Sequence, residues 1–231
     1  MSLAPEPQQA RARVTRQKVV ASAVALLAED GLSGVRTAAV ARRAGVSQGA
    51  LFRHFPTKAL LLGAALESTL DALFLRFGAA LMERVGRGEE ALRAGVDALW
   101  EVYTDPALYG GFELFLAART DPALRAVTGP VLQAHLEREV GMARRLWPDA
   151  AASHPRFHAT VVGLLATLQG LAVGAAAWPL PHDADRPERP VELDFIEELA
   201  RRELGPLSID ALSVDVLSID ALSIDALGVS P

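Results

Sequence analysis

The 231-residue sequence contains no cysteine, so disulfides, thiol catalysis and thiolate metal sites are excluded. It also lacks an uninterrupted apolar run of the roughly 18 residues that a membrane-spanning helix needs. The stretch 161–178 comes closest, but Thr167, Gln169 and several glycines interrupt it. The polar N-terminus leads into a basic segment and does not resemble a signal peptide. We therefore expect a cytoplasmic protein with no membrane partner.

Catalytic patterns are missing as well. The sequence shows no nucleophile–base pair, no glycine-rich phosphate loop and no metal-ligand spacing, and its histidines His135, His154 and His158 are not grouped as ligands. We expect no metal, no cofactor and no enzymatic activity. An enzyme built on a helical scaffold is the alternative that these absences argue against.

Lysine is scarce, and the basic charge is unevenly distributed. Residues 1–60 carry nine Lys and Arg against three acidic residues, a balance of +6. The remainder carries 14 basic and 25 acidic residues, a balance of −11. A basic N-terminal segment beside an acidic remainder is the charge distribution that phosphate binding at one end requires.

Apolar residues recur at helical spacing up to Leu204, and no strand pattern precedes residue 206, so we expect an all-α fold. The pattern divides the chain into an N-terminal three-helix helix-turn-helix domain at 13–66, a C-terminal helical domain at 67–204 and a tail at 205–231. Pro130 falls inside an expected helix and predicts a kink or a break at Gly129. The expected helices are 13–30, two within 36–55, 57–85, 89–103, 106–119, 122–146, 155–177 and 191–204.

The segment 36–55 has the pattern of a helix-turn-helix motif. Thr37 is a suitable N-cap, and Val40, Ala41 and Ala44 give the short helix that follows it one apolar stripe. Gly45 can adopt the left-handed backbone that ends a helix and turns the chain. Val46 is the expected buried residue of the turn.

A second short helix follows the turn. Ser47 is its expected N-cap, and Leu51 and Phe55 lie four residues apart on its inward face. Pro56 stops it, because proline offers no N–H and disfavours helix in the residue before it. The outward face carries Gln48, Gly49, Ala50, Arg53 and His54.

These outward residues suit contact with DNA. In a helix-turn-helix the N-terminal end of the second helix meets base edges in the major groove, and the Gln48 amide can pair with an adenine edge. Lys58 opens the next helix, where its charge faces the positive end of the helix dipole. That position is favourable if a phosphate lies there. The alternative is a pair of alanine-rich core helices with a solvated polar face.

The segment from Thr15 to about Leu66 resembles the DNA-binding domain of the TetR family of one-component transcriptional regulators. The matching blocks are Thr15–Lys18, Glu29–Gly31, Val40–Ala41, Ala44–Ser47 and Leu51–Lys58. The resemblance implies phosphate contacts by Thr37, His54 and Lys58, and a groove-facing surface of Ser47, Gln48, Gly49 and Arg53. Ala50, on the same outward face, can touch a thymine methyl.

Two positions depart from the family pattern. Phe52 stands where the family usually has a phosphate-binding tyrosine, so ring packing is kept and a hydroxyl is lost. Ala50 stands where threonine is frequent. Both departures imply fewer bonds to the DNA backbone with the fold intact.

The resemblance also implies a role for the C-terminal helical domain, which in this family dimerises and holds a small effector. We expect the effector of this chain to be apolar. Helices 131–146 and 155–177 are the candidates for a homodimeric four-helix bundle, with intramolecular packing as the alternative. The resemblance implies a repressor that binds a palindromic operator in double-stranded DNA and is released by the effector. An architectural DNA-binding protein without an effector is the alternative. The candidate effector-lining residues are Phe74, Trp100, Tyr103, Tyr109, Phe112, Phe115 and Arg119.

The tail repeats Leu-Ser-Ile-Asp-Ala every five residues between Leu207 and Ala226. This period matches neither a helix nor a strand, since each repeat of a strand would switch faces. We expect the tail to have no role in binding DNA.

Overall fold

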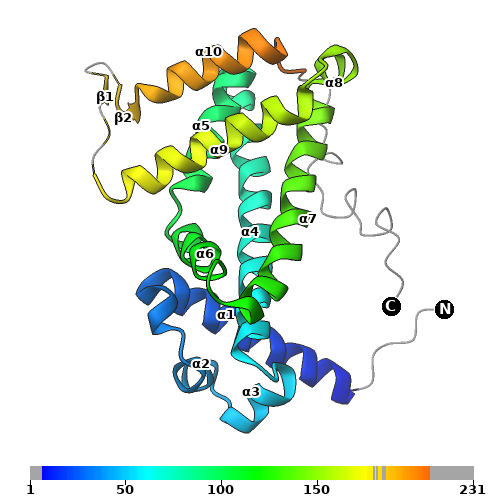
Figure 1. Cartoon of the computed structure of the whole chain (residues 1–231), viewed down its shortest axis with the longest axis vertical. Helices are drawn as coiled ribbons and strands as arrows, with labels where there is room; N and C mark the ends of the chain where they lie inside the picture. The colour runs from blue at the N-terminus through cyan, green and yellow to red at the C-terminus, as the bar shows by residue number, and fades with distance from the viewer. Residues whose placement is uncertain (1–6, 179, 181, 184–185, 209–231) are drawn as a thin grey trace, which may run out of the picture. The chain divides into compact units, whose positions relative to one another are not determined.

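A computed structural model of the chain describes residues 7–178, 180, 182–183 and 186–208 (Figure 1). Two compact units are formed. Unit 1 contains the chain up to Asp71 together with Asp105–Gln133, and unit 2 contains Ala72–Thr104 and the chain from Ala134 onward. Two long helices, α4 (Lys58–Gly86) and α7 (Pro122–Leu146), contribute to both units.

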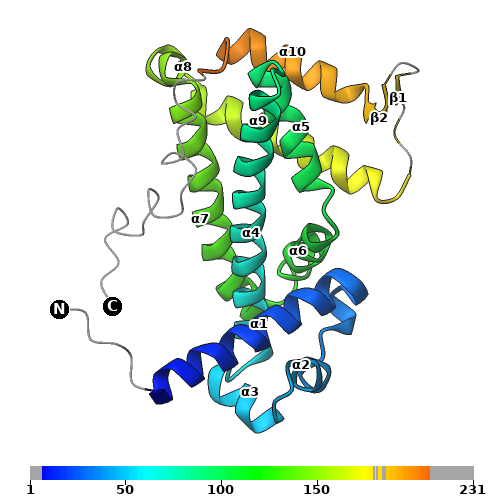
Figure 2. The same ribbon diagram turned by 180° about the vertical axis from the view of Figure 1, so that it is seen from behind.

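Unit 1 is organised around its first helix. This helix packs against α2 and α6 and also touches α3 (Figure 2). Its inward face carries Val19, Ala23, Leu26 and Leu27, which are all buried, as their spacing predicts. Besides parts of α4 and α7, the unit contains α1 (Pro7–Gly34), α2 (Thr37–Ala44), α3 (Gln48–His54) and α6 (Pro106–Ala117).

Unit 2 holds the remaining elements, and α10 packs on both α5 and α9. Arg189 ties these elements together: its Nε lies 2.6 Å from Asp97 Oδ1 on α5, and its Nη2 lies 3.1 Å from Glu197 Oε2 on α10. A buried apolar cluster consists of Val140, Ala143, Phe157, Val161 and Leu204. The elements are α5 (Ala91–Tyr103), α8 (Pro148–Ser153), α9 (Phe157–Ala175), β1 (His182–Asp183), β2 (Arg186–Pro190) and α10 (Glu192–Leu204).

The all-α class is confirmed, with local differences from the expected elements. β1 and β2 pair as a small antiparallel sheet, so the expectation of no strand before residue 206 is wrong. α8 was also missed, because six residues are too few to show a helical period. α1 starts at Pro7 rather than at residue 13. α7 continues through Pro130, so the helix does not end at Gly129.

α9 combines an apolar composition with considerable exposure. It is the helix among the described residues that is long and apolar enough to cross a membrane, with a mean hydropathy of 1.5, although 28% of that window is buried. Length and composition alone do not separate a membrane helix from a helix that associates with another protein surface. Val173 on α9 is 45% exposed.

The chain beyond α10 continues to pack against unit 2 for a few residues. Leu207 is buried, and the Ser208 N–H donates to the Leu146 carbonyl at 2.9 Å. The Trp147 indole N–H donates to the Gly205 carbonyl at 3.2 Å. The first residues of the expected tail therefore belong to the packed structure, whereas the rest of the repeat lies outside the described residues.

Candidate nucleic-acid interface

The turn between α2 and α3 has the geometry that its glycine predicts. Gly45 adopts φ 67° and ψ 33°, a left-handed conformation that favours glycine. Its N–H donates to the Arg42 carbonyl at 3.2 Å, and the next N–H, from Val46, donates to the Ala41 carbonyl at 3.0 Å. Free carbonyls at the end of α2 are thereby satisfied.

Buried side chains fix the two short helices against α1. Val40, Ala41, Leu51 and Phe55 are all buried, and the inward direction expected for Leu51 on α3 and for Phe55 at its C-cap is confirmed. The Arg16 guanidinium of α1 lies 5.2 Å from the centroid of the Phe55 ring, a cation–π contact.

Two details of the motif differ from expectation. Thr37 is not an N-cap: Arg36 occupies that position without a side-chain cap, and Thr37 is the first helical residue. The reason is that the chain enters α2 one residue earlier than the hydroxyl pattern suggests. Val46 is half-buried rather than buried, because it lines an open cleft described below.

The cap of α3 is confirmed. Ser47 Oγ accepts a hydrogen bond of 3.1 Å from the Ala50 N–H, which fixes the first turn of the helix. The following helix has a similar start, because Thr57 Oγ1 accepts from the Leu60 N–H at 3.2 Å. Lys58 is thus held at the N-terminus of α4, where its side chain is exposed.

The residues expected to face DNA lie on α3, just before it at Ser47, and at the first residues of α2 and α4. Each of them is exposed or half-buried. Phe52 is 41% exposed, although its ring is apolar. Exposed positions are Ser47, Gln48, Gly49, Phe52, Arg53 and Lys58, and half-buried ones are Thr37, Ala50 and His54.

Some basic side chains of unit 1 form intramolecular ion pairs, and others do not. Arg43 forms a two-pronged pair with Glu29 at 2.6 and 2.7 Å, and this hydrogen bonding holds the pKa of Glu29 below its ordinary value. Within the described part of the chain, Arg53 and Lys58 have no hydrogen-bond or ion-pair partner. Their charges remain available to an anionic ligand.

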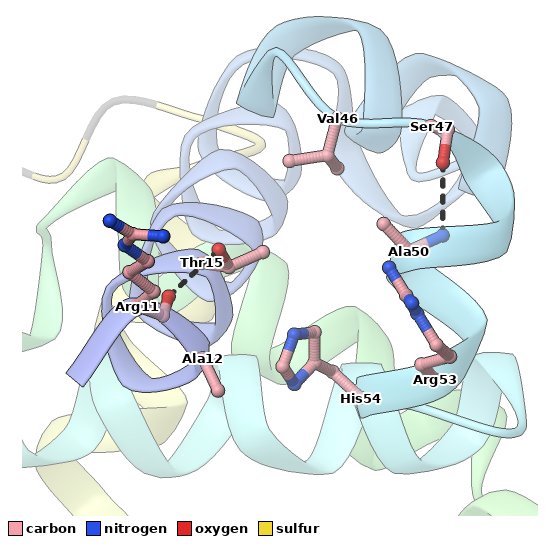
Figure 3. A pocket seen from close by; sticks show the side chains of 8 residues that line it. All are labelled: Arg11, Ala12, Thr15, Val46, Ser47, Ala50, Arg53 and His54. Atoms are coloured by element: carbon pink, nitrogen blue, oxygen red, sulfur yellow. Dashed lines mark hydrogen bonds between the residues drawn. The ribbon is translucent and has the colours of Figure 1, made fainter. Parts of the chain in front are cut away.

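A cleft of about 480 Å³ lies between α1 and α3 (Figure 3). The His54 imidazole projects from α3 toward α1 across this opening. No lining side chain is acidic. The lining consists of Arg11, Ala12 and Thr15 from α1, and Val46, Ser47, Ala50, Arg53 and His54 from the turn and α3.

The candidate effector residues are divided between the units. Phe74, Trp100 and Tyr103 belong to unit 2, whereas Tyr109, Phe112, Phe115 and Arg119 belong to unit 1. In unit 1, Tyr109 and Phe112 form an edge contact with centroids 6.2 Å apart. Phe115 is 52% exposed, and Arg119 is also exposed.

In unit 2 two of these aromatic residues meet polar groups of α7. The Tyr103 hydroxyl donates to Glu139 Oε1 at 3.3 Å, and His135 Nε2 lies 3.5 Å from the same oxygen. Burial, reinforced by this carboxylate, raises the pKa of Tyr103 well above its ordinary value, so the hydroxyl stays protonated. The Arg138 guanidinium lies 4.7 Å from the centroid of the Phe74 ring. We call Phe74, Tyr103, His135, Arg138 and Glu139 the unit 2 polar cluster.

Sequence reasoning missed the three α7 members of this cluster. Arg138 and Glu139 come three and four residues after His135, and side chains at these two spacings both lie next to the first residue on the helix surface. That spacing was the available signal. Among the described residues, no three His, Asp or Glu side chains gather as they would to hold a metal ion.

Comparison with known proteins agrees with this geometry. Residues 19–65 match a family model described as bacterial regulatory proteins, tetR family. The HTH-type transcriptional regulator CymR of Pseudomonas putida is 36% identical over 118 residues, which cover 51% of this chain and 58% of CymR. The chain thus matches a little over half the length of that relative.

Solved structures show the same fold over most of the chain. The multidrug binding protein EbrR complexed with imidazole has a TM-score of 0.58 and 23% identity, covering 84% of this chain and 97% of its own. A TetR-family member from Streptomyces coelicolor A3, SCO1917, has a TM-score of 0.57 and 24% identity, covering 82% and 98%. At these identities the likeness is one of fold.

Proposed function

The chain belongs to the tetR family of bacterial regulatory proteins, and on that premise we propose that it is a repressor released from its operator by a small effector. Members of the family are DNA-binding transcriptional regulators and not enzymes, which agrees with the sequence-based prediction. The observation that supports operator binding most directly is that Arg53 and Lys58, at and just beyond a well-capped α3, are exposed and have no ion-pair partner among the described residues.

In this proposal α3 enters the major groove. Gln48 pairs with a base edge, and Gly49 and Ala50 allow close approach, with Ala50 beside a thymine methyl. Arg53 faces the same groove. Ser47 lies at the groove entrance, whereas Thr37, His54 and Lys58 contact phosphates. Phe52 contributes ring packing only.

A homodimer is the second element of the proposal. Two copies related by a two-fold axis would place two α3 helices about 34 Å apart on a palindromic site. Exposed apolar side chains on α9 and α10 support such an association, since Val173 is 45% and Phe195 63% exposed. The described exposed side chains of residues 131–146 on α7, in contrast, are polar. We therefore assign the dimer to α9 and α10, in place of the pair 131–146 and 155–177.

The third element is the effector. Phe74 and Tyr103 would contact a small, largely apolar molecule, with Glu139 and His135 as polar anchors at one end. The name of EbrR, a multidrug binding protein, is consistent with a helical domain of this fold accepting small molecules. The effector would bind more tightly to a dimer whose two α3 helices have a separation that does not fit the operator. Because a ligand shifts the equilibrium toward the state it binds better, the effector would release the DNA.

Footprinting on the chain's own upstream region tests the proposal. Protection of a palindrome that is lost on adding one of a panel of lipophilic compounds is the expected result. Binding insensitive to both sequence and salt would contradict it, because phosphate contacts make affinity fall steeply with salt. Sequence-specific protection that survives every compound would instead favour the architectural alternative. We place this activity in the cytoplasm, with no membrane partner.

A further inference from the structure

We propose that the cleft between α1 and α3 seats a phosphodiester of the bound duplex, and that Arg11 is a DNA-contacting residue. This inference rests on the proposed function, because it requires a duplex against α3. It adds to the interface a helix outside the helix-turn-helix motif. Three features of the molecule support it: the residues that line the cleft, the availability of their charges and the position of the first turns of α1.

The lining has the composition of an anion site. Arg11 stands on the α1 side and Arg53 on the α3 side, with His54 projecting between them (Figure 3). The apolar part of the lining consists of small side chains, Ala12, Val46 and Ala50. A concave surface of low polarity lined by charges of one sign concentrates the field toward a ligand of the opposite sign.

The guanidinium of Arg11 has no charged partner within the described part of the chain. Its side chain is exposed, and neither a hydrogen bond nor an ion pair to another described residue involves its guanidinium. Arg16 and Arg43 differ, since one lies over the Phe55 ring and the other pairs with Glu29. Arg11 therefore resembles Arg53 in being free to bind a phosphate.

Helix structure holds Arg11 in place. α1 begins at Pro7, so Arg11 lies on a formed helix rather than on a flexible arm. The Thr15 hydroxyl donates to the Arg11 carbonyl at 2.9 Å, which ties together two lining residues one turn apart. A guanidinium presented in this way loses less entropy on binding than one on a disordered segment.

The geometry favours a duplex phosphate over a free anion. Ser47, Ala50 and Arg53 line the cleft and also belong to the surface that would face the groove. A duplex engaged by α3 therefore brings its backbone to this opening. Arg11 would then act on affinity for every sequence, since a phosphate contact positions the protein without reading bases.

Arg13 supplies a matched control. It has the same charge on the same helix and is exposed, but it does not line the cleft. Two residues along an α-helix correspond to a rotation of about 200°, so Arg13 points to the other side of α1. If only the net charge mattered, Arg11→Ala and Arg13→Ala would weaken DNA binding equally.

The experiment measures binding of the full chain to a fluorescent duplex containing its own upstream region, and to a scrambled duplex, over a range of salt concentrations. Arg11→Ala should weaken the binding of both duplexes on the order of tenfold. It should also reduce the slope of log affinity against log salt by about 0.9 per protomer. Arg13→Ala should remain close to the wild type, and Arg11→Lys should keep most of the slope.

If the wild type binds DNA and Arg11→Ala and Arg13→Ala have the same affinity and salt slope, the inference is overturned and the proposed function stands. Replacing chloride by inorganic phosphate at constant ionic strength distinguishes the two sources of the anion. A persisting difference between Arg11→Ala and the wild type supports the duplex phosphate. Its disappearance would assign the cleft to a free anion and overturn the inference. A wild type with no affinity for any duplex would remove the proposed function itself.

Discussion

The carboxylate of Glu113 accepts a hydrogen bond of 2.7 Å from the backbone N–H of Leu32, and so joins α6 to the end of α1. The bond forms beside Gly31, whose φ of 65° and ψ of −170° interrupt the helical backbone. A Cβ added to Gly31 would lie 2.6 Å from Glu113 Oε1. Glycine at this position therefore provides both the backbone conformation and the space for the carboxylate.

Glu113→Ala should lower the free energy of unfolding by about 1 kcal/mol, the usual net contribution of one hydrogen bond. The loss is limited because the Leu32 N–H lies in an exposed region and can bond to water instead. Urea unfolding monitored by circular dichroism measures it. Glu113→Gln keeps an acceptor oxygen and should lose less than the alanine variant. Identical unfolding of both variants and the wild type would show that the bond contributes nothing.

Gly110 and Gly111 are adjacent buried glycines of α6 with different tolerances for a methyl group. A Cβ on Gly110 would lie 2.4 Å from Leu27 Cγ and 2.9 Å from the Leu27 carbonyl oxygen, whereas one on Gly111 would lie 3.4 Å from Leu66 Cδ1. A backbone atom cannot move aside as a side chain does. Gly110→Ala should therefore force α1 and α6 apart and destabilise the protein by roughly 1–3 kcal/mol.

Gly111→Ala is the matched control, and it should stay close to the wild type because its new contacts are ordinary ones. Thermal and urea unfolding of the two variants compare them directly. Equal stability of the two alanine variants would contradict the close packing of α1 against α6.

Local chemistry made much of the DNA-binding domain predictable. The left-handed turn at Gly45, the Ser47 cap and the buried pair Leu51 and Phe55 each follow from the nature of one or two residues. The early start of α1 was not predictable in this way. Its first turns carry polar and basic side chains without an apolar stripe, so hydrophobic periodicity gives no signal there.

The effector candidates show the limit of the same reasoning. Aromatic residues at helical spacing could be identified, but which of them meet in space depends on tertiary packing. Tyr103 and Phe74 contact polar groups of α7, whereas Phe115 is largely exposed. The polar partner Glu139 lies far from Tyr103 in sequence, and nothing in either segment alone indicates the pairing.

Gln48→Ala and Lys58→Ala should weaken DNA binding in different ways. Loss of a base contact should reduce discrimination between the operator and variants at one base pair, by about 1–3 kcal/mol. Loss of the Lys58 ammonium should weaken binding to all sequences alike, and should reduce the slope of log affinity against log salt by about one. Binding to a set of single-substitution operators over a salt series separates the two effects. Similar losses of discrimination in both variants would contradict the assignment of Lys58 to a phosphate.

Phe52→Tyr should strengthen DNA binding. The residue is 41% exposed on α3, where the family usually has tyrosine, so an added hydroxyl would reach a phosphate oxygen without repacking the core. A hydrogen bond to a charged group contributes about 1.5–3 kcal/mol, so affinity should rise by roughly ten- to a hundredfold. Phe52→Leu is the control, since it keeps an apolar side chain without a hydroxyl and should not gain. Unchanged affinity of the tyrosine variant would place this position away from the DNA backbone.

Removal of the repeat tail should have no effect on DNA affinity, provided that the truncation leaves the packed residues in place. Leu207 is buried and Ser208 donates to the Leu146 carbonyl, so the truncation belongs after Ser208. Deleting residues 209–231 should preserve both operator affinity and the unfolding midpoint. Leu207→Ala in the full chain, by contrast, should cost about 2–5 kcal/mol, because it leaves a cavity beside Gly95. Anisotropy titrations and urea unfolding of the two variants test this boundary. A large loss of affinity in the truncated protein would mean that the repeat itself takes part in binding DNA.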